Sequence, residues 1–322
     1  MIKVAIAGGT GYTAGELLRI LTRHPEAEVT DVLSTTSAGK AVTSFHRDLL
    51  GETDLHFTDT LSGNEDVIFL CLGHGLSREF LDSHKLADGC RIIDLGNDFR
   101  TEPDYKGRHF VYGLTDVFKG DIEGCDCVAN PGCFATSIQL AAAPLAAMHL
   151  LEDEVHVTAI TGSTGAGRKL SETSHFSYRN DNISVYKPFT HQHLGEIRHT
   201  FGILGGSCPQ VNFVPMRGDF TRGIFASVYT RCGMDAVQLN ELYNNYYNDS
   251  PFVFVSEEPV SLKEVVGTNK CLLHVESHNG YAHITSIIDN LTKGASGQAV
   301  ENMNLMFGLG QTTGLMFKAN YY

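Results

Sequence analysis

The chain has 322 residues, of which 42% are apolar and 19% charged, and its formal net charge is −13. This composition excludes a disordered chain, and the length favours two domains of ordinary size. The acidic balance argues against a nucleic-acid partner, and no apolar stretch is long enough for a membrane span or a secretory signal, so we expect a cytoplasmic protein.

Short apolar runs alternate with helical patterns in the first half of the chain. We predict strands at 3–7, 29–34, 67–72 and 91–95, and helices at 14–24 and 76–86. Near-continuous apolar strands separated by helices are typical of a parallel sheet covered on both faces. The first half is therefore predicted to be an α/β, Rossmann-like doubly wound domain.

A glycine-rich turn, Gly8-Gly9-Thr10-Gly11-Tyr12-Thr13-Ala14-Gly15, lies between the first predicted strand and the first predicted helix. At this place in an alternating domain, backbone N–H groups and the helix dipole suit the pyrophosphate of a dinucleotide. Glycines also serve ordinary tight turns, but the position of this turn favours a nucleotide site.

The end of the second predicted strand indicates which nucleotide is bound. NAD enzymes commonly place an acid there to hold the ribose 2′-hydroxyl, but Asp31 falls inside the predicted strand. The strand end carries Ser34-Thr35-Thr36-Ser37 followed by Lys40. Hydroxyls and a lysine, with no carboxylate to repel a 2′-phosphate, favour NADP(H) over NAD; a simple polar loop is the alternative.

Eight cysteines are scattered along the chain without zinc-ligand spacing, so reduced thiols and no metal site are expected. One of them stands apart. Pro131 and Gly132 end a predicted strand, and Cys133 follows at the start of an apolar helical stretch that runs through Met148. The dipole and N–H groups of a helix N-terminus stabilise a thiolate, so Cys133 is the candidate nucleophile.

An activated thiolate needs an acid/base partner, and the best candidates lie in His191-Gln192-His193-Leu194-Gly195-Glu196. If this segment is helical, Glu196 lies three residues beyond His193 and fixes the tautomer of that imidazole. Metal ligation and surface histidines without a role are alternatives, although no third metal ligand at suitable spacing is evident.

The second half has longer strands that alternate in and out. Strands are predicted at 271–277 and 281–289 around Asn279-Gly280, a dipeptide that favours a tight hairpin. The segment 295–309 has the spacing of an amphipathic helix. We therefore expect a second, α+β domain with a mainly antiparallel sheet.

Several segments along the chain, taken in order, resemble the motifs of one family. They are GGTGYTAGELL (8–18), DLGNDFR (94–100), 112–114, NPGC (130–133), TGSTGAGR (161–168), HQHLGEI (191–197), PMRGDFTRGI (215–224) and IDNLTKGASGQAVENMNL (288–305). This pattern resembles the N-acetyl-γ-glutamyl-phosphate reductases, which are related in fold to aspartate-semialdehyde dehydrogenase and glyceraldehyde-3-phosphate dehydrogenase. The resemblance extends over nearly the whole chain.

The resemblance implies NADPH-dependent reduction of N-acetyl-γ-glutamyl phosphate to N-acetylglutamate 5-semialdehyde in arginine biosynthesis, by a homodimer or homotetramer. It implies a glyceraldehyde-3-phosphate-dehydrogenase-like fold, with an NADP-binding domain of residues 1–132 plus 297–322 and a catalytic, substrate and oligomerisation domain of residues 133–296. Cys133 would be the nucleophile, with His193, or else His191, as acid/base and Glu196 as its partner. The implied cofactor contacts are Gly8, Thr10, Gly11, Tyr12, Thr13, Ala14, Ser34, Ser37, Gly294 and Gly297. The implied substrate contacts are Arg100, Asn130, Ser163, Arg168 and Arg222.

The chain departs from the family pattern around the substrate. The family usually has Cys-Tyr-Pro-Thr and His-Arg-His-x-Pro-Glu-Ile, where this chain has Cys133-Phe134-Ala135-Thr136 and His191-Gln192-His193-Leu194-Gly195-Glu196-Ile197. Gln192 removes a cation and Gly195 loosens the turn, so an N-succinyl substrate is an alternative. A sister dehydrogenase acting on aspartyl or glyceraldehyde phosphate and a non-catalytic NADP-sensing regulator are further alternatives. A short-chain dehydrogenase is disfavoured because no tyrosine has a lysine four residues later.

Overall fold

The computed structural model describes residues 1–322 and divides them into two compact units. Unit 1 contains Met1–Pro131 and Ala295–Met316, and unit 2 contains Gly132–Gly294 and Phe317–Tyr322. The chain passes from unit 1 to unit 2 after Pro131 and back to unit 1 after Gly294, and both of these crossings lie within two residues of the expected boundaries. The last segment is a correction, because we expected 317–322 in the nucleotide-binding part. No periodic pattern follows the last helix, so the sequence held no signal that could place this tail.

Unit 1 is built on a six-stranded parallel sheet in the order β2-β1-β3-β4-β8-β7. Its strands are β1 (Ile2–Ala7), β2 (Ala27–Leu33), β3 (Val67–Leu70), β4 (Arg91–Asp94), β7 (Val111–Tyr112) and β8 (Cys127–Ala129), and a two-stranded ribbon consists of β5 (Asp104–Tyr105) and β6 (Arg108–His109). Every residue of β3 is buried, as in a sheet covered on both faces. The predicted Rossmann-like sheet is confirmed.

The helices of unit 1 are α1 (Tyr12–Leu21), α2 (Ser77–Ser83), α3 (Thr115–Ile122) and α8 (Gly297–Met306), with short 3₁₀ turns at Val42–Ser44 and Arg47–Leu49. Helix α8 returns late in the chain to pack against α1 and α3. Strand β1 lies between β2 and β3, so the chain leaves β1 toward one side and later returns on the other. The carboxyl end of β1 is therefore the switch point where open α/β sheets bind ligands.

Unit 2 contains a seven-stranded mixed sheet in the order β10-β11-β9-β12-β15-β14-β13. Its strands are β9 (Val155–Thr161), β10 (Ser184–Val185), β11 (Val211–Arg217), β12 (Ile224–Arg231), β13 (Val253–Ser256), β14 (Cys271–His278) and β15 (Tyr281–Ile288). Most neighbours are antiparallel, but β9–β11 and β13–β14 are parallel. The predicted β14–β15 hairpin is present, and Asn279 and Gly280 both have the positive φ of a tight turn.

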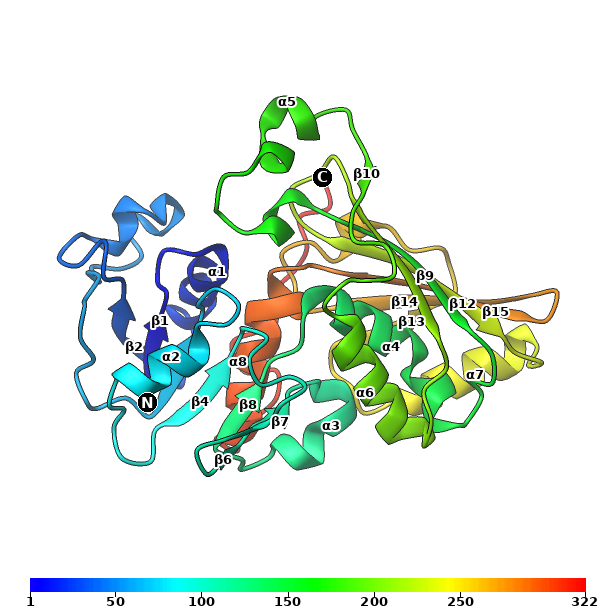
Figure 1. The fold of residues 1–322 in the computed structure, drawn as a ribbon, viewed down its shortest axis with the longest axis horizontal. Coiled ribbons are helices and arrows are strands. Elements are labelled where there is room, and N and C mark those ends of the chain that lie inside the picture. The colour runs from blue at the N-terminus through cyan, green and yellow to red at the C-terminus, as the bar shows by residue number, and fades with distance from the viewer. The chain divides into compact units, whose positions relative to one another are not determined.

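Three long helices of unit 2, α4 (Cys133–Ala147), α6 (Leu194–Gly205) and α7 (Ala236–Tyr246), pack on the sheet, as Figure 1 shows. The rest is short: α5 (Phe176–Arg179), 3₁₀ turns at Ser163–Ala166, Glu172–Ser174 and Leu262–Glu264, and a π-helical turn at Thr292–Ser296. Helix α4 is almost wholly buried although it contains Pro144, which has no N–H to donate to the carbonyl of Leu140. The Tyr247 hydroxyl donates to that oxygen at 2.6 Å instead, so the buried carbonyl keeps a partner.

The expected elements are present, but their ends differ from the expected ends by up to three residues. The last predicted helix begins at Gly297 instead of residue 295, because the residues before it form the π-helical turn. Sequence periodicity cannot distinguish an α-helical from a π-helical first turn, since one extra residue shifts the pattern only slightly. No helix of the structure is long and apolar enough to cross a membrane.

The carboxyl group of Asp94 at the end of β4 is completely buried in unit 1. It accepts hydrogen bonds from the Ser77 hydroxyl at 2.6 Å and from the Gly96 N–H at 2.9 Å. Burial outweighs these two hydrogen bonds and the charge of Arg100, and it raises the pKa of Asp94 to about 6. A carboxyl whose pKa is higher in the folded than in the unfolded state stabilises the fold while protonated and loses that stability as the pH rises.

We expect Asp94→Asn to remove this pH dependence. The stability that the Asp94 proton gives the wild type is present below about pH 4 and is lost by about pH 6 to 7. Across this range, the free energy of unfolding of the variant should therefore rise by about 3 kcal/mol relative to that of the wild type. Urea denaturation at several pH values measures the difference, with the exposed Asp59→Asn as control for the loss of one carboxylate. Parallel pH curves for wild type and Asp94→Asn would contradict the assignment.

Candidate active site

The glycine-rich turn of unit 1 lies at the switch point of the sheet. Gly8 has φ +84°, and a Cβ there would lie 2.5 Å from the carbonyl oxygen of Cys71, the residue that follows β3. Gly11 is the N-cap of α1, and no side chain caps the helix and no acidic residue lies in its first turn. The first N–H groups of α1, from Tyr12, Thr13 and Ala14, thus form an anion-binding end that fits a pyrophosphate.

The end of β2 is the place where the sequence predicts a distinction between NADP(H) and NAD. Asp31 is buried within β2, where its carboxylate accepts from the Ser62 hydroxyl at 2.7 Å and the Thr30 hydroxyl at 2.9 Å. The strand ends at Leu33, and the exposed residues beyond it include Thr35, Thr36 and Lys40, while Ser34 is half-buried and Ser37 buried. No carboxylate therefore stands at the strand end itself.

Asn130 connects the two places where the chain crosses between the units. Its Nδ2 donates to the carbonyl of Ala295 at 3.1 Å, and its Oδ1 accepts from Asn302 of α8 at 3.1 Å. Arg100 is buried and donates to the carbonyl oxygens of Asn130 at 2.9 Å and Leu95 at 3.1 Å. Of the two expected substrate contacts, Arg100 therefore holds the backbone at Asn130, three residues before Cys133, and the Asn130 side chain holds the backbone at Ala295.

The other expected cofactor residues, Gly294 and Gly297, lie on either side of the second crossing, and each side packs within its own unit. In unit 1, the Ser296 hydroxyl donates to the carbonyl of Thr13 at 2.8 Å, which ties the segment before Gly297 to the start of α1. In unit 2, a Cβ on Gly294 would lie 2.9 Å from the Cβ of Cys133. Glycine at 294 therefore lets the backbone of the π-helical turn approach the cysteine.

Cys133 is the first residue of α4, a 15-residue helix whose N-cap is Gly132. As in α1, no side chain caps the helix and its first turn contains no acidic residue. The position predicted from the sequence, a cysteine at a helix N-terminus, is the one observed. The residue is half-buried.

Glu196 and His193 close the space behind Gly132. The N–H of Gly132 donates to Glu196 Oε2 at 3.0 Å, and Glu196 Oε1 lies 3.9 Å from His193 Nε2. Both side chains are buried. His193 is the N-cap of α6, which places Glu196 in the first turn, where a carboxylate is favoured by the helix dipole. The expected helical spacing of His193 and Glu196 is thus observed.

His191 lies behind His193 in an aromatic cluster. Its ring is 4.6 Å from the His193 ring, and its Nδ1 accepts from the His193 N–H at 3.2 Å. Phe134 and Phe213 pack edge-on against His191, with centroid distances of 5.6 and 5.4 Å. His191 therefore holds the backbone of His193, and His193 is the histidine that lies against Gly132.

The other three expected substrate contacts, Arg222, Ser163 and Arg168, differ in whether the structure already gives them a partner or leaves them on a loop. Arg222 donates through Nε and Nη2 to the fully buried Asp289 at 2.9 and 3.0 Å, so this arginine has a structural ion pair. Ser163 begins the 3₁₀ turn after β9, and Arg168 lies in the exposed loop beyond it. The sequence could not show that Arg222 meets Asp289, because 67 residues separate the two.

Three residues that no sequence motif singled out form a cluster that reaches His191 through Tyr186. Tyr186 packs edge-on against His191 with a centroid distance of 5.7 Å, and the guanidinium of Arg217 lies 3.8 Å from the centroid of the Tyr186 ring. Arg179 donates to the carbonyl of Gly218, next to Arg217, at 2.8 Å. Their only sequence signal is a position inside or next to the quoted motifs, since Arg217 lies within PMRGDFTRGI and Tyr186 precedes HQHLGEI.

Other thiols are held in the protonated form. Burial raises the pKa of Cys71 and Cys90 to about 12, and that of Cys125 and Cys127 to about 11. None of these four cysteines begins a helix. The structure also contains no group of three or more His, Cys, Asp or Glu side chains that could hold a metal ion.

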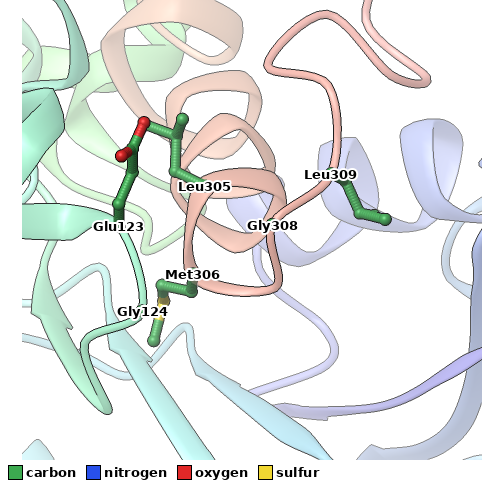
Figure 2. Close-up of a pocket in the computed structure, with 6 residues that line it drawn as sticks. All are labelled: Glu123, Gly124, Leu305, Met306, Gly308 and Leu309. Carbon is green, nitrogen blue, oxygen red and sulfur yellow. The ribbon is translucent and has the colours of Figure 1, made fainter.

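A cavity of about 510 Å³ lies elsewhere in unit 1, at the carboxyl end of α8 (Figure 2). It is lined by Glu123, Gly124, Leu305, Met306, Gly308 and Leu309. Helix α8 spans about 15 Å, and its other end adjoins the glycine-rich turn through Ser296 and Thr13. With one carboxylate and no cation or nucleophile, this cavity is not the candidate site.

Comparison with known proteins agrees with this geometry. Residues 3–125 match the family model described as semialdehyde dehydrogenase, NAD binding domain, and residues 133–290 match semialdehyde dehydrogenase, dimerisation domain. A protein from Flavobacterium johnsoniae named N-acetyl-gamma-glutamyl-phosphate reductase is 53% identical over 321 residues, which is 99% of either chain. One of the same name from Azobacteroides pseudotrichonymphae is 51% identical over 323 residues, which is 100% of either chain. This chain belongs to the N-acetyl-γ-glutamyl-phosphate reductase family.

Among solved structures, aspartate semialdehyde dehydrogenase with NADP from Candida albicans is similar with a TM-score of 0.73 and 15% identity, over 95% of this chain and 99% of that one. At this identity the likeness shows the fold alone. The predicted family, fold class and enzyme class, an oxidoreductase, are confirmed. The first half is a nicotinamide-dinucleotide-binding domain.

We expect Gly132→Ala to destabilise the protein because there is no room for the added methyl group. The backbone of Gly132 (φ −71°) suits any residue, but a Cβ would lie 2.4 Å from His193 Nε2 and 2.7 Å from Glu196 Oε1. Such overpacking typically costs about 1–3 kcal/mol of the free energy of unfolding. Gly202→Ala in α6 is the matched control, because no atom lies within 4 Å of the added Cβ, and a helical Gly→Ala change stabilises by up to about 1 kcal/mol. Equal stability of the two variants in chemical denaturation would show that the crowding is absent.

Proposed function

We propose that this protein catalyses NADPH-dependent reduction of N-acetyl-γ-glutamyl phosphate to N-acetylglutamate 5-semialdehyde, with release of phosphate, as a cytoplasmic step of arginine biosynthesis. The observation that carries the proposal is the arrangement around Cys133, a cysteine at the start of α4 with His193 and Glu196 packed behind Gly132. Membership of the reductase family supports the substrate.

NADP(H) is the proposed form of the nicotinamide cofactor. Gly8, Thr10, Gly11, Tyr12, Thr13 and Ala14 would hold the pyrophosphate, and Gly294 and Gly297 would lie near the nicotinamide. Ser34, with Lys40 nearby, would receive the 2′-phosphate, and the buried Ser37 would support it through its N–H, which donates to the Ser34 carbonyl at 3.2 Å. The burial of Asp31 leaves no carboxylate at the strand end to repel the phosphate. The bound cofactor would supply the hydride that reduces the enzyme-linked acyl group.

Cys133 is the proposed nucleophile. Its thiolate, stabilised by the N-terminus of α4, attacks the γ-acyl carbon of the substrate. A carbon–sulfur bond forms, the bond from that carbon to the phosphate oxygen breaks, and phosphate leaves with the electron pair. A hydride, together with a proton from the charged His193 ring, would convert the resulting thioester to a thiohemiacetal. Its collapse breaks the carbon–sulfur bond, returns the proton to His193, releases the semialdehyde and restores the thiolate.

His193 is the proposed acid/base, and it takes the proton as the semialdehyde is expelled. Its position next to Gly132 favours it over His191, whose Nδ1 accepts from the His193 backbone. Glu196 would hold the His193 ring and stabilise its charged form. N–H groups at the start of α4 would bind the oxyanion, and removal of one such donor typically costs about 100- to 1000-fold in rate.

The remaining proposed contacts divide into two kinds. Ser163 and Arg168, on the loop after β9, would touch the substrate. Arg100, Asn130 and Arg222 would act through the residues that they hold, because their side chains bind carbonyl oxygens or Asp289. We further propose a homodimer or homotetramer, which the match of residues 133–290 to a dimerisation domain supports.

The proposed reaction is tested in reverse, as phosphate-dependent reduction of NADP by the purified protein. N-acetyl- and N-succinyl-glutamate semialdehyde are compared side by side, with NAD as the second cofactor. We expect turnover that requires both phosphate and NADP, and the better semialdehyde identifies the acyl group. Turnover with aspartate semialdehyde alone would favour the sister enzyme, and tight NADPH binding without any turnover would favour a sensor.

We expect Cys133→Ser to lower turnover by at least about a thousand-fold, because the hydroxyl cannot replace the thiolate nucleophile. Cys208→Ser is the control, since burial raises the pKa of this half-buried thiol and it lies in the turn after α6. Iodoacetamide near neutral pH should label Cys133 first and abolish activity in parallel. Near-normal turnover of Cys133→Ser would rule out the thioester mechanism.

A further inference from the structure

Two arginines of unit 2 lie in one cluster and have no carboxylate that forms an ion pair with them. Arg217, at the end of β11, lies over the ring of Tyr186, and its guanidinium makes no hydrogen bond to the protein. Arg179, at the end of α5, is only 8% exposed, and its one hydrogen bond goes to the Gly218 carbonyl. A nearly buried arginine usually has an anionic partner, so the cluster lacks a negative charge.

The two guanidinium groups repel each other. Burial lowers the pKa of Arg179, and the charge of Arg217 lowers it further, while Tyr186 and Asp219 offset only part of this. Asp219 does not bridge the pair, because its Oδ2 accepts from the backbone N–H of Asp181 and the residue is exposed. Two like charges held together in this way favour the binding of an anion between them.

Tyr186 links this pair to the candidate nucleophile. Its ring packs against His191, which packs against His193, and His193 adjoins Gly132 just before Cys133. Burial, and then the charge of Cys133, raise the pKa of Tyr186 well above its usual range. The hydroxyl therefore stays protonated and remains a hydrogen-bond donor near the sulfur.

We propose that Arg179, Arg217 and Tyr186 form a binding site for an anionic group of the substrate, a carboxylate or its phosphate, beside Cys133. This assignment rests on the proposed function. It gives the anchoring role expected of Arg222 to arginines that no carboxylate occupies. The planar fork of Arg217 and the Arg179 guanidinium suit a planar or tetrahedral oxyanion, and the Tyr186 hydroxyl adds a neutral donor.

The kinetic test compares Arg179→Gln and Arg217→Gln with the wild type in the reverse reaction. We expect the Michaelis constant of one reactant to rise about 10- to 100-fold with a smaller change in kcat, as for loss of a charged hydrogen bond in binding. Arg217→Lys, which keeps the charge but not the fork, should be intermediate. Arg231→Gln is the matched control, because Arg231 ends β12 and lies 4.8 Å over the ring of Tyr281.

Three arms identify which anion is bound. If the Michaelis constants of both semialdehydes rise and the Michaelis constant of phosphate is unchanged, the site binds the glutamate carboxylate. A higher constant for phosphate alone assigns it to the phosphate. A loss confined to N-succinyl-glutamate semialdehyde assigns it to the carboxylate of the acyl group. Constants within twofold of the wild type for every reactant would overturn the proposal.

A second measurement needs no turnover, so it separates this inference from the proposed function. Arg217→Gln relieves the repulsion, and we expect its melting temperature without added anions to equal or exceed that of the wild type. N-acetylglutamate or inorganic phosphate should raise the melting temperature of the wild type and have little effect on Arg217→Gln. Equal responses of the two proteins would overturn the anion site even if the reductase activity is established.

Discussion

The hydrogen bond from the Gly132 N–H to Glu196 Oε2, 3.0 Å long, is the contact on which the arrangement around Cys133 depends. It joins the N-terminus of α4 to the first turn of α6 across 64 residues of sequence. Both ends are buried, so the carboxylate bonds the N–H without competition from water. Because Glu196 Oε1 also lies 3.9 Å from His193 Nε2, the same carboxylate adjoins both the start of α4 and the imidazole.

Two glycines leave the space that this arrangement needs. Gly132 leaves the space that the His193 ring occupies, and Gly294 lets a second backbone segment approach the Cβ of Cys133. Asn130 lies two residues before Gly132, and its side chain donates to the carbonyl of Ala295, where the chain crosses between the units a second time. The two short crossings between the units are therefore fixed by hydrogen bonds inside each unit, close to the residues that are proposed to bind cofactor and substrate.

The arginines show how charge is distributed by tertiary structure. Arg222 and Asp289 form a satisfied ion pair that anchors the segment after β15, where Asp289 also accepts from the N–H groups of Gly267, Leu291 and Thr292. Arg179 and Arg217 have no such partner: Arg217 lies over the Tyr186 ring, and Arg179 donates to the Gly218 carbonyl. A pair that costs stability through repulsion is retained where an incoming anion is to be bound, which is a common reason for strain at functional sites.

The sequence by itself determined the strand-helix alternation, the nucleotide turn at Gly8–Gly15, the Asn279-Gly280 hairpin and the cysteine at a helix start, because each depends on local spacing and on the conformational limits of Gly, Pro and Asn. It also determined the family, through the order of its motifs. Only the tertiary structure decided which arginine forms the ion pair with Asp289, which two arginines cluster with Tyr186, and which histidine adjoins Gly132. These are contacts between residues far apart in sequence, and they depend on how the elements of unit 2 pack, which no local pattern encodes.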